Sequence, residues 1–260
     1  MIDKPKHLGP EYAAQFMDKS VAEAYPHRPP YTIETFEILL NYIPEGPRIV
    51  LDLGCGTGDV ARRIAGEVDR VDAVDPSLPL ITVGRSMPGA DDWRLRWIQS
   101  TAEDFHYADT YGLICAAESF QWMDWEVVLK KIGQALKPSG KFLLLQRKTD
   151  EQPWKDEVCE LVSRYSTNQD YKPYDLTSEL IARNLVEFHF ETPTPEMVHT
   201  QSIHSYIESY HSKNGFSRQR MGLEAASRFD QEMREILKPH AYNGYLEYVI
   251  YTHITGLNPL

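Results

Sequence analysis

The sequence has little cysteine and no long apolar run. Its three cysteines, Cys55, Cys115 and Cys159, are widely separated and lack Cys-x-x-Cys spacing, which argues against a disulfide framework and a zinc knuckle. No window of about 18 uncharged apolar residues occurs, and the N-terminal stretch "MIDKPKHLGPEYAAQ" has no apolar signal-peptide core. We therefore expect an unexported cytoplasmic protein with no membrane partner and no bound metal.

Basic residues are also scarce relative to acidic ones. The 27 lysines and arginines face 38 aspartates and glutamates, so the formal net charge is -11. This charge repels polyphosphates and anionic lipids, which argues against nucleic acid as a partner. With 42% hydrophobic residues among 260, the chain is long enough to bury a substantial core.

Strand-like and helical patterns alternate through the middle of the chain. Two helices are expected first, and five strands then alternate with helical segments, which predicts a mainly parallel, doubly wound sheet. The expected helices are 11–24, 32–43, 59–65, 77–85 and 125–136, and the expected strands are 48–53, 70–74, 95–99, 112–117 and one within 137–146.

The C-terminal third follows a different pattern. Helices are expected over 154–165, 203–213 and 224–237, and the runs "VEFHFE" and "YLEYVIYTHI" read as strands that close the sheet antiparallel. The prediction is a single α/β, Rossmann-like domain over 1–260 with a seven-stranded sheet. Its parts are N-terminal lid helices (1–44), a ligand-binding core (45–148), and lid insertions with closing strands (149–260).

The stretch "VLDLGCGTGD" (50–59) places a glycine-rich turn directly after the first strand. Such a turn lets a ligand lie against the backbone, and the next helix offers free N–H groups. The dinucleotide fingerprint G-x-G-x-x-G fails here because Asp59 stands where its last glycine is needed. Asp52 and Asp59 would repel a pyrophosphate, so their charge favours a cationic ligand.

The glycine stretch and four later segments resemble, in order, the landmarks of class I S-adenosylmethionine-dependent methyltransferases. "VLDLGCGTG" looks like the family's first motif, and "VDAVDPS" places Asp75 where the family keeps an acid for the ribose hydroxyls. "STAEDF", "AAESFQWMDW" and "ALKPSGKFLLL" resemble its later segments, so the likeness covers roughly residues 31 to 147. The resemblance implies S-adenosyl-L-methionine as cofactor and a methyltransferase activity.

The resemblance also implies roles for single residues. Asp75 is expected at the ribose with Pro76 beside it, although an aspartate here could instead cap the helix that begins near Ser77. Arg28 in "YPHRPPY" is expected at the cofactor carboxylate, or it is a surface arginine held between prolines. The remaining residues expected at the cofactor are Asp52, Gly54, Gly56, Gly58, Thr101, Ala102, Glu103 and Ala117.

Thr101 departs from the family pattern. Related proteins often carry Asp at this position, so the acceptor for the adenine amino group is open, with Glu103 or Asp104 as substitutes.

The acceptor side is less defined by sequence. "SFQWMDW" resembles the "FHW" stretch of trans-aconitate-type carboxyl methyltransferases, which implies that Gln121 and Trp122 lie beside the transferred methyl group. Gln121 replaces a frequent histidine and cannot act as a base. His211 is a candidate base, with Tyr171 or Tyr174 facing the same pocket. We expect a small-molecule acceptor and O-methylation, with a carboxylate as one option, and N- and C-methylation are close alternatives.

Three alternatives are weighed against this interpretation. A sensor or scaffold could bind S-adenosylmethionine or its demethylated product without transferring the methyl group, and a dehydrogenase is a more distant option. The letters "PPY" also occur in DNA amino-methylating enzymes, but Arg28 stands where those enzymes need a hydrogen-bond acceptor.

Overall fold

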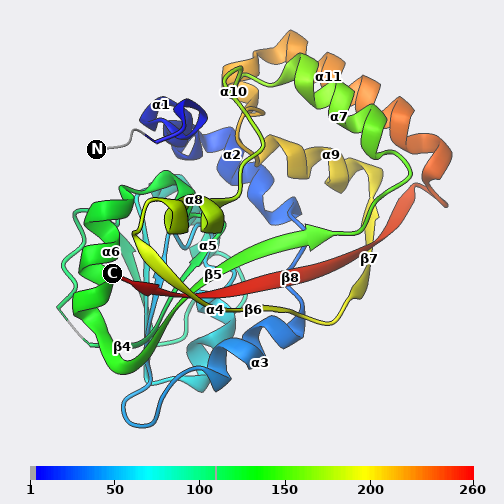
Figure 1. Ribbon diagram of the computed structural model, residues 1–260. Coiled ribbons are helices and arrows are strands. Elements are labelled where there is room, and N and C mark those ends of the chain that lie inside the picture. Colours follow the sequence, from blue (N-terminus) through cyan, green and yellow to red (C-terminus); the bar gives the residue numbers. More distant parts are fainter. Residues whose placement is uncertain (1–3, 109) are drawn as a thin grey trace.

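The computed structural model describes residues 4–108 and 110–260, which form one eight-stranded sheet with helices on both faces (Figure 1). The strand order is β3-β2-β1-β4-β5-β8-β6, and β7 pairs with β8 off this path. The first five strands pair parallel to one another. They are β1 (Ile49–Leu53), β2 (Arg70–Asp75), β3 (Leu95–Gln99), β4 (Tyr111–Ala117) and β5 (Leu136–Thr149).

The closing strands are antiparallel, as expected, but there is one more than predicted. Strand β8 (Tyr245–Pro259) pairs with β5, β6 (Val186–Pro193) and β7 (Met197–Ser202). The predicted seven-stranded sheet is therefore corrected to eight strands. Strand β8 is long enough to pair with β6 along one half and with β7 along the other, so both short strands share the same edge.

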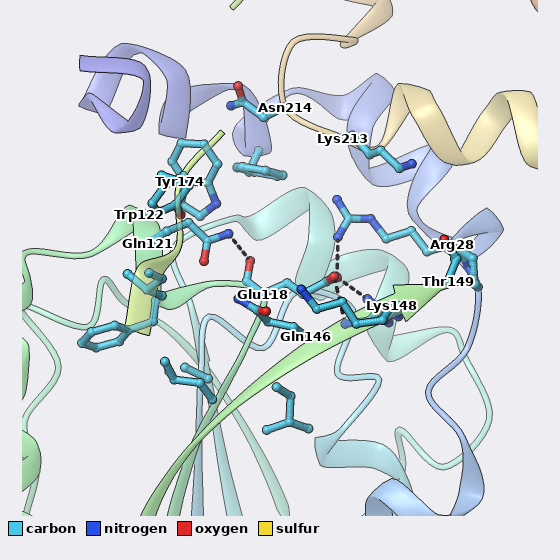
Figure 2. A pocket seen from close by; sticks show the side chains of 18 of the residues that line it. Arg28, Glu118, Gln121, Trp122, Gln146, Lys148, Thr149, Tyr174, Lys213 and Asn214 are labelled. Carbon is cyan, nitrogen blue, oxygen red and sulfur yellow. Dashed lines mark hydrogen bonds and ion pairs between the residues drawn. The ribbon is translucent and has the colours of Figure 1, made fainter. Parts of the chain in front are cut away.

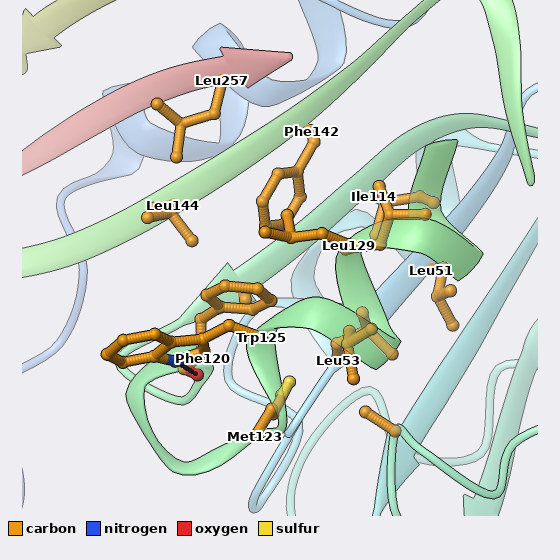
Figure 3. Close-up of a cluster of buried hydrophobic side chains, with 14 of the residues drawn as sticks. Leu51, Leu53, Ile114, Phe120, Met123, Trp125, Leu129, Phe142, Leu144 and Leu257 are labelled. Atoms are coloured by element: carbon orange, nitrogen blue, oxygen red, sulfur yellow. Dashed lines mark hydrogen bonds between the residues drawn. The ribbon is translucent and has the colours of Figure 1, made fainter. Parts of the chain in front are cut away.

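Alternate residues of the central strands face opposite layers. Leu51 and Ile114 point into a cluster formed with α6 (Trp125–Ala135) and α8 (Leu176–Ala182), which Figure 3 shows around Phe120. Their neighbours in the strands point the other way, toward α3 (Ile33–Asn41) and α4 (Ala61–Ile64). This two-residue period buries both faces of the sheet, as a parallel sheet requires.

The predicted helix over 11–24 is broken in the structure. It consists of α1 (Pro10–Ala13), a 3-10 turn (Ala14–Met17) and α2 (Lys19–Ala24), with Asp18 extended between the last two. The Asp18 carboxylate accepts hydrogen bonds from Ser217 and Arg220. These long-range partners favour an extended residue where the local pattern favours helix.

Helices of the C-terminal third form a separate layer at the far ends of β5 and β8 (Figure 1). They pack around the fully buried Phe229 and Met233, and we call this layer the helical cap. Its helices are α7 (Lys155–Tyr165), α9 (Ile203–His211), α10 (Arg218–Met221) and α11 (Leu223–Leu237). The remaining helix, α5 (Leu78–Arg85), follows β2. The other 3-10 turns are Lys6–Leu8, Tyr25–His27, Ala65–Glu67, Phe120–Trp122 and Lys238–His240.

Four buried threonines tie the start of α3 to the closing strands. Thr35 Oγ1 donates to Thr252 Oγ1 at 2.8 Å, and Thr32 Oγ1 donates to Thr194 Oγ1 at 3.0 Å. All four side chains are buried, so their hydroxyls need protein partners, which are the other hydroxyls and, for Thr194, the backbone of Pro195 and Thr252. The network fixes the segment that precedes α3, which includes Arg28.

Replacing Thr35 with valine should lower the free energy of unfolding by about 1–3 kcal/mol, because the isosteric change leaves the Thr252 hydroxyl buried without its donor. Urea denaturation of both proteins measures the difference. The exposed Thr82, which bonds only within its own helix, provides the control Thr82→Val. Equal effects of the two substitutions would contradict a structural role for the network.

Candidate functional site

A cavity of about 250 Å³ opens at the carboxyl ends of β1 and β2. Ligands of open α/β sheets bind at this edge. Phe16, Met17 and Tyr25 from the N-terminal segment line its wall. We call it the glycine-loop cavity. The predicted residues that line it are Gly54, Asp75, Pro76, Thr101, Ala102, Glu103 and Trp122.

The Asp75 carboxylate accepts hydrogen bonds from the backbone around the glycine turn and also faces the glycine-loop cavity. Its Oδ2 accepts from the Gly56 N–H and its Oδ1 accepts from the Ser77 N–H, each at 2.8 Å. Burial raises the pKa of Asp75 to about 6, and these two hydrogen bonds oppose the rise. Each carboxylate oxygen keeps a second acceptor position, so a diol in the cavity could still donate to it. The helix itself is capped by Ser77, whose hydroxyl accepts from the Leu80 N–H.

The three glycines of the loop face different surroundings. Gly54 lines the cavity with φ +67°, and a Cβ there would collide with the Ser119 side chain. Gly58, at φ +72°, packs instead against Trp97. Gly56 lies under the Tyr25 ring. Of the three glycines, only Gly54 lines the glycine-loop cavity.

The segment after β3 holds its side chains in local hydrogen bonds. Thr101 Oγ1 accepts from the Asp104 N–H at 3.0 Å and donates to the Asp104 carboxylate at 2.9 Å. Glu103 Oε1 accepts from the Asp124 N–H at 2.6 Å, while Ala102 is buried. Thr101 and Glu103 therefore shape the cavity wall with side chains that already have partners.

The charge argument made from the sequence needs correction. Asp52 is 1% exposed and lines neither this cavity nor the one described next, because its Oδ2 accepts from the Ala61 N–H where α4 begins. Burial raises the pKa of Asp52 to about 7. Asp59 pairs with Arg147 at 2.7 Å and with Arg63 at 3.4 Å. Neither acid presents a free negative charge to a cationic ligand.

Ala117 also lies away from both cavities. Its side chain packs on the α3 and α4 side of the sheet, because strand residues alternate between faces. Ala116 and Glu118 point to the cavity side instead. Glu118 has φ +55°, which is rare for a residue with a side chain and typical of functional sites.

A second cavity of about 660 Å³ adjoins the first and shares Phe16, Glu118 and Trp122 with it. Figure 2 shows side chains from the ends of β4 and β5, the N-terminal segment and the loop after α9 converging on it. We call it the basic cavity. Its charged lining residues are Arg28, Glu118, Arg147, Lys148 and Lys213.

The basic cavity is built around one half-buried carboxylate. Glu118 Oε2 pairs with Arg147 Nη1 at 2.6 Å and with Arg28 Nη1 at 3.5 Å. Burial opposes ionisation of Glu118, but the two arginines outweigh it and lower the pKa of Glu118. Within residues 4–108 and 110–260, Lys148 and Lys213 form no ion pair, so the cavity carries an excess of positive charge.

Lys213 is the cation whose charge is most easily changed. Solvent reaches its side chain, yet protein surrounds the cavity into which the ammonium points (Figure 2). Desolvation, followed by repulsion from Arg28, lowers the pKa of Lys213 to about 8, although Glu118 acts in the opposite direction. Its Nζ also lies 3.7 Å from the centroid of the Tyr210 ring.

Arg28 contacts the cap rather than a free ligand group. Its Nε donates to Ser212 Oγ at 2.8 Å and its Nη2 donates to the Ser212 carbonyl at 2.6 Å. Its guanidinium stacks 4.1 Å from the Tyr25 ring centroid. It lines the basic cavity and not the glycine-loop cavity. Arg28 is thus no loose surface arginine, and it joins the N-terminal segment to the helical cap.

Trp122 lies where the two cavities meet, and Gln121 lines the basic cavity beside it. Gln121 Nε2 donates to the Glu118 carbonyl at 2.8 Å, which holds the amide at the wall (Figure 2). The Trp122 ring packs 5.4 Å from the ring of Phe16, between centroids. Tyr171 and Tyr174 line the basic cavity, as expected.

The structure does not place His211 at this site. Its imidazole is fully buried in the helical cap, where Nδ1 lies 2.8 Å from the Phe216 carbonyl and Nε2 lies 2.6 Å from Asp230 Oδ1. It lines neither cavity, so the expectation that His211 faces the pocket is corrected. The polar and charged residues on the same helix suggested a functional role for His211. In the structure the Phe229 ring packs against the imidazole inside the cap.

Sequence reasoning missed Glu118, Arg147 and Lys213. The first two stand at the carboxyl ends of β4 and β5, which is itself a signal for a ligand-binding position. No signal in the sequence identifies Lys213, because it reaches the cavity from a loop whose position depends on the packing of the cap.

Comparison with known proteins agrees with this geometry. Residues 50–140 match the family described as a methyltransferase domain. A solved protein from Anaeromyxobacter dehalogenans, classed with the type II methyltransferases, superposes with a TM-score of 0.61 at 21% identity, covering 88% of this chain and 97% of its own. A Geobacter sulfurreducens S-adenosylmethionine-dependent methyltransferase, solved with S-adenosylhomocysteine, gives 0.52 at 16% identity, covering 97% and 99%.

The chain has the fold of the class I methyltransferases. Among curated proteins, an uncharacterized methyltransferase of Mycobacterium tuberculosis is 30% identical over 140 residues, which is 53% of this chain and 54% of that protein. A ubiquinone/menaquinone biosynthesis C-methyltransferase of Rubrivivax gelatinosus is 33% identical over 107 residues, 41% of this chain and 42% of that protein. The chain thus spans about half the length of the first of these relatives. These matches show the methyltransferase fold, and the matched proteins include an S-adenosylmethionine-dependent methyltransferase.

The residues of this methyltransferase fold suit that cofactor. The glycine-loop cavity offers a buried carboxylate for a diol at Asp75 and an apolar slot beside Leu80 and Ala102 for a base. Backbone at Gly54 forms the remaining wall without a Cβ. Of the helices in the described part of the chain, none is long and apolar enough to span a membrane.

The pH dependence of stability tests whether Asp52 is buried and protonated in the folded protein. Its raised pKa means that the native state keeps a proton which the unfolded chain has released above about pH 4. Stability should therefore fall as pH rises from about 4 to about 7, by at most about 1.4 kcal/mol per unit from this group. Asp52→Asn should show a shallower slope in urea denaturation at pH 5, 6 and 7. Identical slopes would contradict a buried, protonated Asp52.

Proposed function

We propose that the protein transfers a methyl group from S-adenosylmethionine to the oxygen of a carboxylate on a small-molecule acceptor. The observation that carries this proposal is the meeting of two unlike cavities at Phe16, Glu118 and Trp122. One has the glycine turn and a carboxylate, and the other has an excess of cations. A donor and an anionic acceptor could thus be held on either side of a common boundary.

The glycine-loop cavity is the proposed cofactor site. Bound S-adenosylmethionine supplies an electrophilic methyl group on a sulfonium sulfur. Asp75 would accept from the ribose hydroxyls, and Ala102 and Leu80 would pack on the adenine. Phe16 and Trp122, in contact at the shared boundary, would exclude water from the reacting groups.

The basic cavity is the proposed acceptor site. Lys213 and Lys148 would hold the acceptor's negative charge and orient it toward Trp122. A carboxylate is already ionised at neutral pH, so its methylation needs no proton acceptor. The described residues lining this cavity include no histidine, and burial raises the pKa of Tyr174, which makes it a poor base. The trans-aconitate-type likeness of Gln121 and Trp122 points in the same direction.

The rival proposal is a protein that binds the cofactor without transferring methyl. The deep basic cavity next to the cofactor site favours an enzyme, because a sensor needs no second small-molecule site. Incubation with methyl-labelled S-adenosylmethionine and a metabolite extract separates the two. We expect a labelled ester identified by mass spectrometry, and stoichiometric binding without any labelled product would favour the sensor.

Asp75→Asn should weaken S-adenosylhomocysteine binding by about tenfold to a hundredfold, because charge-assisted hydrogen bonds contribute roughly 1.5 kcal/mol each. Isothermal titration calorimetry measures this. Asp91→Asn is the matched control, because Asp91 is an exposed carboxylate that lines neither cavity. Unchanged affinity in Asp75→Asn would remove Asp75 from the cofactor site.

Lys213→Met should raise the KM for the acidic acceptor at least tenfold at pH 7, because it removes an ammonium and keeps the apolar stem. In the parent protein KM should rise as pH increases through about 8, where Lys213 loses its charge. Lys213→Arg should keep a low KM above pH 8. A turnover number that increases through pH 8 in the parent protein, with no such increase in Lys213→Arg, would instead assign Lys213 as a proton acceptor. That result would contradict the charge-binding role.

A further inference from the structure

The basic cavity continues into a third cavity of about 610 Å³, which reaches beneath the helical cap. The two are contiguous, because they share part of their walls. The shared residues are Gln121, Trp122, Tyr171, Tyr174, Lys213 and Asn214. We call the third cavity the aromatic chamber. It is separate from the glycine-loop cavity except at Trp122.

The lining of the aromatic chamber differs from that of the basic cavity. Tyr210 and Phe216 from the cap face it, with Val162 of α7 and the buried Leu8 of the N-terminal segment. Among the described residues that line it there is no carboxylate, and Lys213 is its one lysine or arginine. Polar residues also line it, among them the buried His7, whose pKa burial lowers, and the uncharged Ser163, Ser166, Asn168, Gln169 and Asn214. The chamber can therefore take an uncharged, largely apolar group.

Lys213 stands at the junction of the two spaces. Its ammonium lies over the face of Tyr210, 3.7 Å from the ring centroid, and its side chain lines both cavities. A carboxylate bound at Lys213 would thus lie next to the chamber, and Trp122 is the residue that lines this chamber, the basic cavity and the glycine-loop cavity. A compact polyacid would use the cations but leave the aromatic walls without a partner.

We propose that the acceptor is an amphipathic monocarboxylic acid, whose carboxylate lies at Lys148 and Lys213 and whose apolar chain or ring lies in the aromatic chamber. This rests on the proposed function and specifies its substrate class. Each methylene removed from water into the chamber should tighten binding roughly fourfold. The apolar part then sets specificity, while the cations fix which oxygen faces the cofactor site.

Calorimetric titration of the S-adenosylhomocysteine complex with simple acids tests this. Octanoate should bind with one site per chain and at least tenfold more tightly than butanoate or succinate. Octan-1-ol, which has the same chain and no charge, should also bind at least tenfold more weakly than octanoate. Octanoate no tighter than succinate would overturn the proposal.

Substitutions on α7 test whether the apolar part of the acceptor occupies the aromatic chamber. Val162→Trp fills the chamber and should weaken octanoate at least tenfold without changing butanoate or S-adenosylhomocysteine affinity. Glu160→Trp puts the same ring on the exposed side of α7 and should leave octanoate binding unchanged. Octanoate affinity that stays at the parent value in Val162→Trp, or falls equally in both variants, would overturn the proposal.

Alkylation of Cys159 repeats the test without a mutation in the packed cap. Cys159 is exposed and lines the chamber, whereas Cys55 and Cys115 are buried. N-ethylmaleimide on the folded protein should weaken octanoate binding, and Cys159→Ser should be insensitive to the reagent. Unaltered octanoate binding by the alkylated protein would contradict occupation of the chamber.

The outcomes separate this inference from the function on which it rests. A parent protein that fails to bind S-adenosylhomocysteine would contradict the proposed function. Normal binding of that ligand together with no preference for octanoate would contradict the amphipathic acceptor alone.

Discussion

The half-buried ion pair between Glu118 and Arg147 is the contact on which the rest of the site depends. It joins the ends of β4 and β5 at 2.6 Å, and the same guanidinium reaches Asp59 at 2.7 Å and lies 3.8 Å from the Tyr31 ring centroid. Arg28 adds the N-terminal segment to this centre. A buried carboxylate without its cation would be strongly unfavourable, so these elements must meet in one arrangement. That arrangement places both cavities side by side.

The two sides of the boundary differ in charge because of the same centre. Glu118 and Asp59 neutralise much of Arg147, so the positive charge available to a ligand comes from Lys148 and Lys213 at the rim. On the other side Asp75 is occupied by backbone N–H groups yet keeps acceptor capacity. The protein as a whole is acidic at -11, but this local region is basic. The local charge around the cavities therefore predicts the charge of a ligand better than the net charge of the whole protein does.

The glycine turn shows why a correct motif can rest on an incorrect physical argument. The sequence argument interpreted Asp52 as a negative charge that attracts a cationic ligand. In the structure the Asp52 carboxylate is buried under the turn and accepts a hydrogen bond from the Ala61 N–H. Its carboxylate holds the start of α4 beside the loop, so its effect on the site is through backbone position. The likeness to a methyltransferase domain holds because the turn geometry is needed, whatever the charge of Asp52.

The sequence by itself determined the parallel strands β1 to β5, the glycine turn and the position of Asp75, because hydrophobic period and turn residues act within a few positions of each other. Only the tertiary structure decided that Ala117 faces away, that His211 is buried in the cap and that Lys213 reaches the basic cavity. It also supplied β7, whose partner β8 lies far along the chain. These features depend on contacts between distant segments, and local patterns contain no record of them.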